Sequence, residues 1–114
     1  MSKLDEKVGQ YIDDLKSKVG ENEPDVDLLR KIAKSMGPSI YNADAATVSS
    51  SSESEVETVK KNFIMNKLGI EDDSKANEAL NQVFEKYGKS NRNKYRVVIY
   101  YLLTKHFKKE GLYK

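Results

Sequence analysis

The chain has 114 residues, of which 38% are hydrophobic and 33% are charged, and it carries a net charge of +2. A chain of this length can form one hydrophobic core without disulfide cross-links, so we expect a single domain that spans residues 1–114. The chain contains no cysteine, which excludes disulfides, cysteine-ligated zinc and thiol catalysis.

Apolar residues in the first third of the chain recur at three- and four-residue steps, which is the spacing of amphipathic helices. The first stripe runs from Leu4 to Val19 and stops at Gly20. The second begins after Asp25, a predicted N-cap, and ends at Gly37. The next residues, PSIY, should form a single helical turn because proline is well suited to a first helical position.

The serine run before residue 53 predicts a helix start. Ser52 with Glu55, or Ser54 with Glu57, matches the Ser-x-x-Glu capping box, and the acidic residues lie near the positive end of the helix dipole. We therefore expect a third helix that closes at Gly69. A fourth should begin around the acidic turn at 71–74 and stop at Gly88.

The last segment, GKSNRNKYRVVIYYLLTKHFKK (88–109), departs from this amphipathic pattern. Its apolar run Val97–Leu103 covers every side of a helix, which is typical of a helix buried all round. The run could also suit a buried strand, but the cap residue Ser90 and the basic end near Lys109 favour a helix between them. The predicted fold is all-α: a compact single-domain bundle of about five helices around an apolar C-terminal helix.

The apolar run is also too short for a membrane span. A bilayer requires about 20 apolar residues, and the first ten residues do not have the basic-then-apolar layout of a signal peptide. We therefore expect a cytoplasmic protein with no membrane partner.

Charge is unevenly distributed along the chain. From Lys86 onward, nine basic residues stand against the single acid Glu110, whereas residues 1–85 hold the other 11 basic and 17 acidic residues. Such a split can indicate an anionic partner. It can also mean that the basic end packs against the acidic body of its own chain, and we favour this second interpretation.

The candidate anion or partner surface is the basic collar of the last helix: Lys89, Arg92, Lys94 and Arg96. If Ser90 caps the helix, Arg92 and Lys94 lie in its first turn, where backbone N–H groups attract anions. Arg92 and Arg96 are four residues apart and would share a face. The cations could equally form internal salt bridges as a structural collar.

The candidate supporting segment is the irregular stretch that contains Tyr41, Asn42 and Asp44. Both stretches are polar and lie at helix boundaries, so each could supply hydrogen-bond partners for the other. The specific prediction is that Asp44, or an acid near it, pairs with Arg92 or Arg96.

Nothing in the sequence indicates catalysis, a cofactor or a metal. His106 is the only histidine, and a surface or half-buried helix position is the simplest interpretation of it. The acidic residues 71–73 lack the spacing of a calcium loop, and no nucleotide-binding or hydrolase motif occurs. We predict no catalytic, cofactor-binding or metal-binding residues.

Tyrosine is the one residue type in excess, with seven copies, at positions 11, 41, 87, 95, 100, 101 and 113. Such rings could line a ligand pocket or stack on bases. At helical spacing they are more often core residues, and we favour core packing.

Two blocks, "MGPSIYNADA" (36–45) and "GKSNRNKYRVVIYYLLTKHF" (88–107), resemble the signature segments of the small bacterial family known as domain of unknown function 2853. The segments "VKKNFIMNKLGI" (59–70) and "SKLDEKVGQYIDDLK" (2–16) are similar to it as well. The resemblance covers nearly the whole chain. It implies a small bacterial protein with a single domain, and it implies no activity and no site residues.

Three functional hypotheses follow. The first is a non-catalytic helical protein that acts through an interaction surface on a protein partner or as a homodimer. The second is nucleic-acid or polyanion binding by the basic C-terminal face, with phosphate contacts from Arg92, Arg96, Lys105, Lys108 and Lys109. The third is a small-ligand or enzyme site in a tyrosine-lined cavity.

Overall fold

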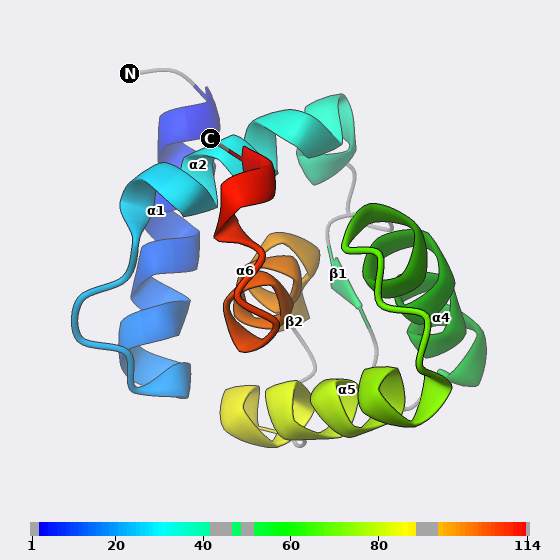
Figure 1. The fold of residues 1–114 in the computed structure, drawn as a ribbon. Coiled ribbons are helices and arrows are strands. Elements are labelled where there is room, and N and C mark those ends of the chain that lie inside the picture. The colour runs from blue at the N-terminus through cyan, green and yellow to red at the C-terminus, as the bar shows by residue number, and fades with distance from the viewer. Residues whose placement is uncertain (1–2, 42–46, 49–51, 89–93, 114) are drawn as a thin grey trace.

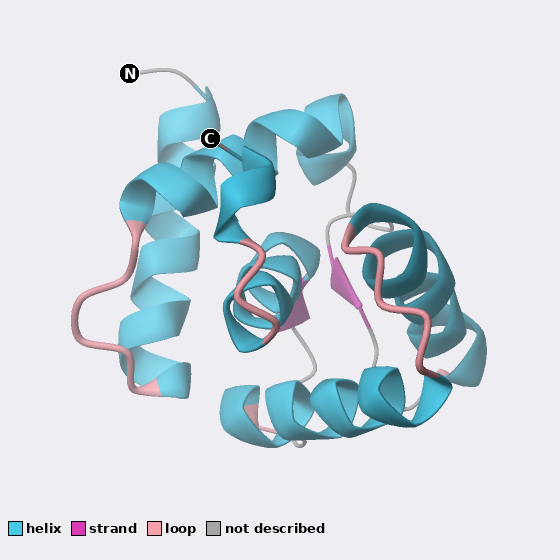
Figure 2. Ribbon diagram, viewed as in Figure 1, coloured by secondary structure: helices cyan, strands magenta, loops and turns pink. Residues whose placement is uncertain are grey.

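A computed structural model describes residues 3–41, 47–48, 52–88 and 94–113. The described residues form five main helices, with α4 and η3 making one continuous helix, and one pair of very short strands (Figure 2). In chain order the elements are α1 (Lys3–Asp14), η1 (Leu15–Val19), α2 (Val26–Met36), η2 (Gly37–Tyr41), β1 (Thr47–Val48), α4 (Glu53–Thr58), η3 (Val59–Lys67), α5 (Asp73–Tyr87), β2 (Lys94–Tyr95), α6 (Arg96–His106) and η4 (Glu110–Tyr113). The predicted all-α architecture is confirmed.

The helix α6 lies at the centre of the molecule, as its apolar run predicts (Figure 1). Seven of its 11 residues are buried, and α1, α2 and α5 pack against it. The buried apolar side chains of these helices form one contiguous core with those of η3. An all-round apolar helix removes the most surface from water when other helices surround it, and this arrangement does so.

The predicted helix ends are largely confirmed. Asp25 caps α2 by accepting a hydrogen bond from the backbone N–H of Leu28 at 3.1 Å, and Ser52 caps α4 in the same way through Glu55. The fourth helix begins at Asp73, where Asp72 is the cap. At the other ends Gly20 and Gly88 have positive φ angles, which cost a glycine little.

We expect Asp25→Ala to lower the free energy of unfolding by about 1 kcal/mol, because it removes the acceptor that satisfies the Leu28 N–H. Urea unfolding measures the loss. Asp25→Asn keeps an oxygen acceptor and should cost less. Asp27→Ala, in the first turn of the same helix, removes an acid without removing the cap. Equal losses for Asp25→Ala and Asp27→Ala would contradict the capping role.

Two helices change their winding along their length. After Asp14, the helix continues as the π-helical turn η1. After Thr58, α4 continues as η3, nine residues of π-helix. At the end of each, a backbone N–H bonds the carbonyl five residues earlier, from Gly20 to Leu15 and from Leu68 to Phe63 at 2.9 Å. The wider winding changes which side chains share a face. In η3, Phe63 and Ile64 are both buried.

The predicted start of the last helix is wrong. The helix begins at Arg96 rather than after Ser90, and the two residues before it, Lys94 and Tyr95, pair with β1 as an antiparallel strand. Tyr95 is the N-cap of α6, with extended backbone angles and no side-chain capping bond. Tertiary partners therefore hold Lys94 and Tyr95 in extended backbone where the local sequence pattern predicts helix.

The predicted end of the last helix is also too late. The regular helix stops at His106 rather than near Lys109, and Lys108 has a positive φ of 56°. The chain then forms the short 3₁₀ turn η4, which brings Tyr113 back onto the core with 9% of its surface exposed. Burying this last tyrosine ring stabilises the reversal of the chain.

Candidate functional site

The strands β1 and β2 bring together two segments that are far apart in the sequence. Thr47 lies opposite Tyr95 and Val48 lies opposite Lys94, in an antiparallel pair. We call these four residues the seam. The described ends of the two sequence stretches that contain the candidate site residues therefore lie side by side.

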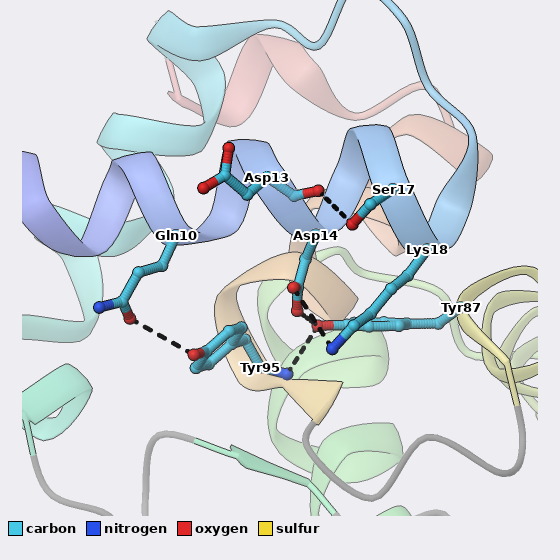
Figure 3. Close-up of polar contacts among 7 residues, drawn as sticks. All are labelled: Gln10, Asp13, Asp14, Ser17, Lys18, Tyr87 and Tyr95. Carbon is cyan, nitrogen blue, oxygen red and sulfur yellow. Dashed lines mark hydrogen bonds and ion pairs between the residues drawn. The ribbon is translucent and has the colours of Figure 1, made fainter.

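A buried hydrogen-bond network fixes the seam to the helices (Figure 3). The hydroxyl of Tyr87, from the last turn of α5, accepts a hydrogen bond from the Tyr95 N–H at 3.1 Å and donates one to the carboxylate of Asp14. Asp14 lies at the end of α1 and is 8% exposed, and Tyr87 is 1% exposed. One phenol thus connects α1, α5 and β2.

Further contacts hold the network from the α1 side. The Lys18 Nζ lies 3.5 Å from the second Asp14 oxygen, one helical turn on. The Tyr95 hydroxyl donates to Gln10 at 3.3 Å, and the Tyr95 ring packs edge-on against Tyr11 with centroids 5.1 Å apart. Tyr95 is therefore held through its backbone, its ring and its hydroxyl, which places the start of α6.

Burial keeps the phenols around the seam protonated. It raises the pKa of Tyr87, and the hydrogen bond to the Asp14 carboxylate raises it further. Burial also raises the pKa of Tyr11 to about 12. On α6, burial together with the nearby charges of Glu21 and Asp25 raises the pKa of Tyr101 to about 12, although the Asp25 N–H bonds its hydroxyl at 2.8 Å. These groups serve as neutral hydrogen-bonding or packing groups rather than as nucleophiles.

These pKa shifts predict alkaline destabilisation. A phenol with a raised pKa in the folded state contributes stability that is complete below its unfolded pKa of about 10 and is lost as the pH rises to about 12. We expect the free energy of unfolding to fall by about 2 kcal/mol from each of Tyr11 and Tyr101 between pH 9 and pH 12. Urea unfolding across this range measures it.

Tyr11→Phe is the informative variant for this pH dependence. Its hydroxyl is buried and finds no hydrogen-bond partner among the described residues, so its loss should cost little at pH 8. The variant should nevertheless show a shallower alkaline decline than the wild type. An unchanged decline would contradict the assignment to Tyr11.

The structure places three of the predicted site residues and does not place the others. Lys94, expected at the surface in the first turn of the last helix, lies in β2 and is 1% exposed; this prediction is wrong. Arg96 is half-buried at the start of α6, and its Nη1 donates to the Tyr100 hydroxyl at 3.4 Å. Tyr41 is exposed at the end of η2.

The remaining candidates, Lys89, Arg92, Asn42 and Asp44, lie outside the described residues. The predicted pairing of Asp44 or a nearby acid with Arg92 or Arg96 therefore stays a prediction. Burial lowers the pKa of Lys94, so this lysine is a poor choice for holding an external anion.

Sequence reasoning missed Asp14 and Tyr87 as partners. From the sequence, Asp14 is indistinguishable from the other charged residues near the end of an amphipathic helix. Tyr87 is likewise indistinguishable from the other inward-facing aromatic residues. One feature of the sequence could have indicated that Asp14 is buried: it lies three residues from Tyr11 and one from Leu15, on the edge of the apolar stripe. A carboxylate at such an edge is buried only when a donor from another element reaches it.

Other predicted contacts are constrained by burial. Because α6 is buried along most of its length, it cannot lie in a nucleic-acid groove as an exposed rod. Its two cations, Arg96 and Lys105, lie at opposite ends of the helix. His106 is exposed and packs edge-on against Phe107.

In the part of the chain that the structure describes, no three metal-binding side chains cluster, and no helix is long and apolar enough to cross a membrane.

Of the seven tyrosines, Tyr11, Tyr87 and Tyr101 are fully buried in the core, which agrees with the favoured core interpretation. Tyr113, at the edge of the core, and the partly buried Tyr100 also line a pocket. The tyrosines therefore serve both to pack the core and to line a pocket.

Taken together, these observations define a small all-α protein whose central helix, α6, begins directly after the second strand of the seam. The sequence model of the family described as "Protein of unknown function (DUF2853)" matches residues 10–111, and the chain belongs to that family. No curated protein matches the chain.

Proposed function

We propose that the protein is a non-catalytic binding protein, and that it binds an anionic partner at the seam and the adjoining start of α6. The observation that supports this most is the β1–β2 pairing, which joins two polar stretches from opposite halves of the chain. We further propose one domain for residues 1–114 and, from the sequence pattern and the family resemblance, a bacterial cytoplasmic setting.

The charge around the start of α6 favours an anion. Arg96 is its first residue, the first turn contains no acidic residue, and the N-cap Tyr95 offers no side-chain capping bond. The positive end of the helix dipole is therefore not offset from within the helix. Lys89 and Arg92 precede it in the sequence and would add positive charge.

The titratable groups nearest the seam support a binding role rather than catalysis. Asp14 is engaged by Tyr87 and Lys18, and burial keeps Tyr87 protonated. These groups fix the backbone of Tyr95, and this rigidity reduces the entropy that an interface loses on binding.

Fluorescence anisotropy with labelled 20-residue polyglutamate, single-stranded DNA and RNA tests the proposal at about 50 and 200 mM salt. We expect at least one polyanion to bind and its affinity to fall steeply at the higher salt. Preference for a nucleic acid over polyglutamate would identify the class of partner. No binding to any probe at the lower salt would overturn the proposal.

Arg96→Gln should weaken that binding about fivefold, because it removes one charged contact at the start of α6. Lys75→Gln, at an exposed position on α5, is the matched control and should have little effect. Equal losses for the two variants would indicate only nonspecific attraction to net charge.

A second copy of the chain is one partner to test, because residues 1–85 carry an excess of acids although the net charge of the whole chain is +2. Sedimentation velocity at the same two salt concentrations tests this form of the proposal. A dimer that dissociates as salt rises would support it, and a monomer at all concentrations would direct the search to other partners.

A further inference from the structure

A second surface feature, independent of the seam proposal, is a pocket of about 210 Å³. Four elements form it: the end of α2, the π-helix η3, α6 and the C-terminal turn η4. Its walls therefore come from residues far apart in the chain, and the return of η4 onto the core closes one side.

The walls of this pocket are aromatic. The rings of Phe63 and Tyr100 stack in parallel, with centroids 3.9 Å apart and planes 6° from each other. Tyr113 adds a third ring, and Met36 adds a flexible apolar side chain. Flat rings and a methionine suit the face and edge of another aromatic ring, because aromatic pairs and sulfur–aromatic contacts are both favourable.

The polar groups of the pocket are one cation and several neutral side chains. The Lys67 Nζ lies 5.1 Å from the centre of the Tyr113 ring. Asn62 and Ser35 contribute an amide and a hydroxyl, and the Tyr100 hydroxyl is linked to the Arg96 guanidinium at 3.4 Å. Among the described residues that line the pocket there is no acidic side chain, so their net charge is positive.

The other described pockets of similar size differ in this respect. One, of about 220 Å³ between α5 and α6, is lined by Glu21 together with Lys86 and Lys105, so an acid stands beside its two lysines. The other, of about 210 Å³, is lined by Asp25, Asp27 and Glu110 with the single base Lys31. Of these three, the pocket beside Tyr100 is the one whose described lining combines several aromatic rings with a cation and no acid.

We propose that the pocket beside Tyr100 binds a small aromatic acid: a single ring that carries a carboxylate. The volume of the pocket limits the size of the ligand. A cavity of about 150 Å³ holds benzene, and 210 Å³ leaves room for one substituent on such a ring. The ring packs against Tyr100 and Tyr113, and the carboxylate accepts hydrogen bonds from Lys67 and Asn62. A charge-assisted bond of this kind is stronger than a neutral one.

Benzoate is the probe for this proposal. Titration of the ¹⁵N-labelled protein, followed by NMR, should shift the side-chain amide of Asn62 and the backbone amides of Lys67 and Tyr113, with a Kd of about 1 mM for a ligand this small. Benzyl alcohol tests the charge and cyclohexanecarboxylate tests the ring. Each should bind at least fivefold more weakly. No shift with benzoate, or equal binding of all three compounds, would overturn the proposal.

Lys67→Gln provides the test on the protein side. We expect it to weaken benzoate binding about tenfold and to leave the weak binding of benzyl alcohol unchanged. Lys61→Gln is the matched control, because Lys61 is an exposed lysine on the same π-helix that pairs with Glu57 at 3.6 Å, outside the pocket. An equal effect of the two substitutions would overturn the assignment of Lys67. Because neither variant touches the seam, the polyanion experiments are independent of this result.

Discussion

Tyr87→Phe should lower the free energy of unfolding by about 3 kcal/mol, because one buried hydroxyl serves two partners. Its loss leaves the buried Asp14 carboxylate with only the Lys18 ion pair among its described contacts, and it leaves the Tyr95 N–H without its acceptor. Phenylalanine keeps the ring, so the loss reports the hydrogen bonds rather than the packing. Urea unfolding at pH 7 measures the change.

Tyr95→Phe is the matched control for this prediction. It also removes one tyrosine hydroxyl, but that hydroxyl makes a single exposed bond to Gln10. We expect a change of less than about 0.5 kcal/mol. If both variants lost the same stability, the network at Asp14 would not be a special feature of the fold.

A double-mutant cycle separates the Tyr87–Asp14 bond from the bond to Tyr95. Asp14→Ala removes the acceptor of the phenol and the partner of Lys18, and the double variant should cost less than the sum of the single changes. A coupling of about 1–2 kcal/mol would support a direct bond. Strictly additive losses would contradict it.

The same substitution should loosen the seam locally. The Tyr95 N–H is the donor in the bond to Tyr87, so its hydrogen exchange should accelerate more in Tyr87→Phe than the exchange of amides in the middle of α5. This comparison links stability to the proposed site, because Tyr95 directly precedes Arg96. Uniform acceleration across the protein would indicate a global effect only.

Local patterns were enough to predict most of the helices. The apolar stripes, the caps Asp25 and Ser52 and the stop at Gly20 act within one or two turns of the chain, and all appear in the fold. The central position of α6 was predictable for a related reason. Its run of seven apolar residues leaves no polar face to present to water.

The start of α6 was not predictable from local patterns because its determinants are distant. Ser90 and the residues after it suit a helix, but the backbone of Lys94 pairs with Val48 and that of Tyr95 bonds Tyr87. These partners are not evident in the sequence around residue 94. Bonds to another strand compete with helical bonds for the same N–H and C=O groups.

The candidate site itself stays a prediction, because most of its residues lie outside the described part of the chain. The strand pairing at Val48 and Lys94 brings together residues next to the stretches that contain Tyr41 and Arg96. The role of Lys94 was wrong, because a charged side chain in a polar run is expected at the surface and this one is buried. Burial of single side chains depends on which elements cover them, and the sequence does not give that information.

Leu103→Ala is expected to have the largest effect of all, a loss of about 3–4 kcal/mol in the free energy of unfolding. Leu103 is fully buried on α6, and truncation removes apolar contacts and leaves a cavity in the middle of the molecule. Chemical unfolding measures the loss, and Leu103→Met, which conserves most of the volume, should cost less than about 1.5 kcal/mol.

Leu112→Ala is the control that makes this result specific to the core. It is the same chemical change in η4, at a leucine that is 48% exposed, and it should cost less than about 1 kcal/mol. Because α6 carries both Arg96 and Tyr100, loss of its packing should also weaken polyanion and benzoate binding together, whereas Lys67→Gln should affect benzoate alone. Equal stability losses for Leu103→Ala and Leu112→Ala would mean that α6 is not the central helix of the folded protein.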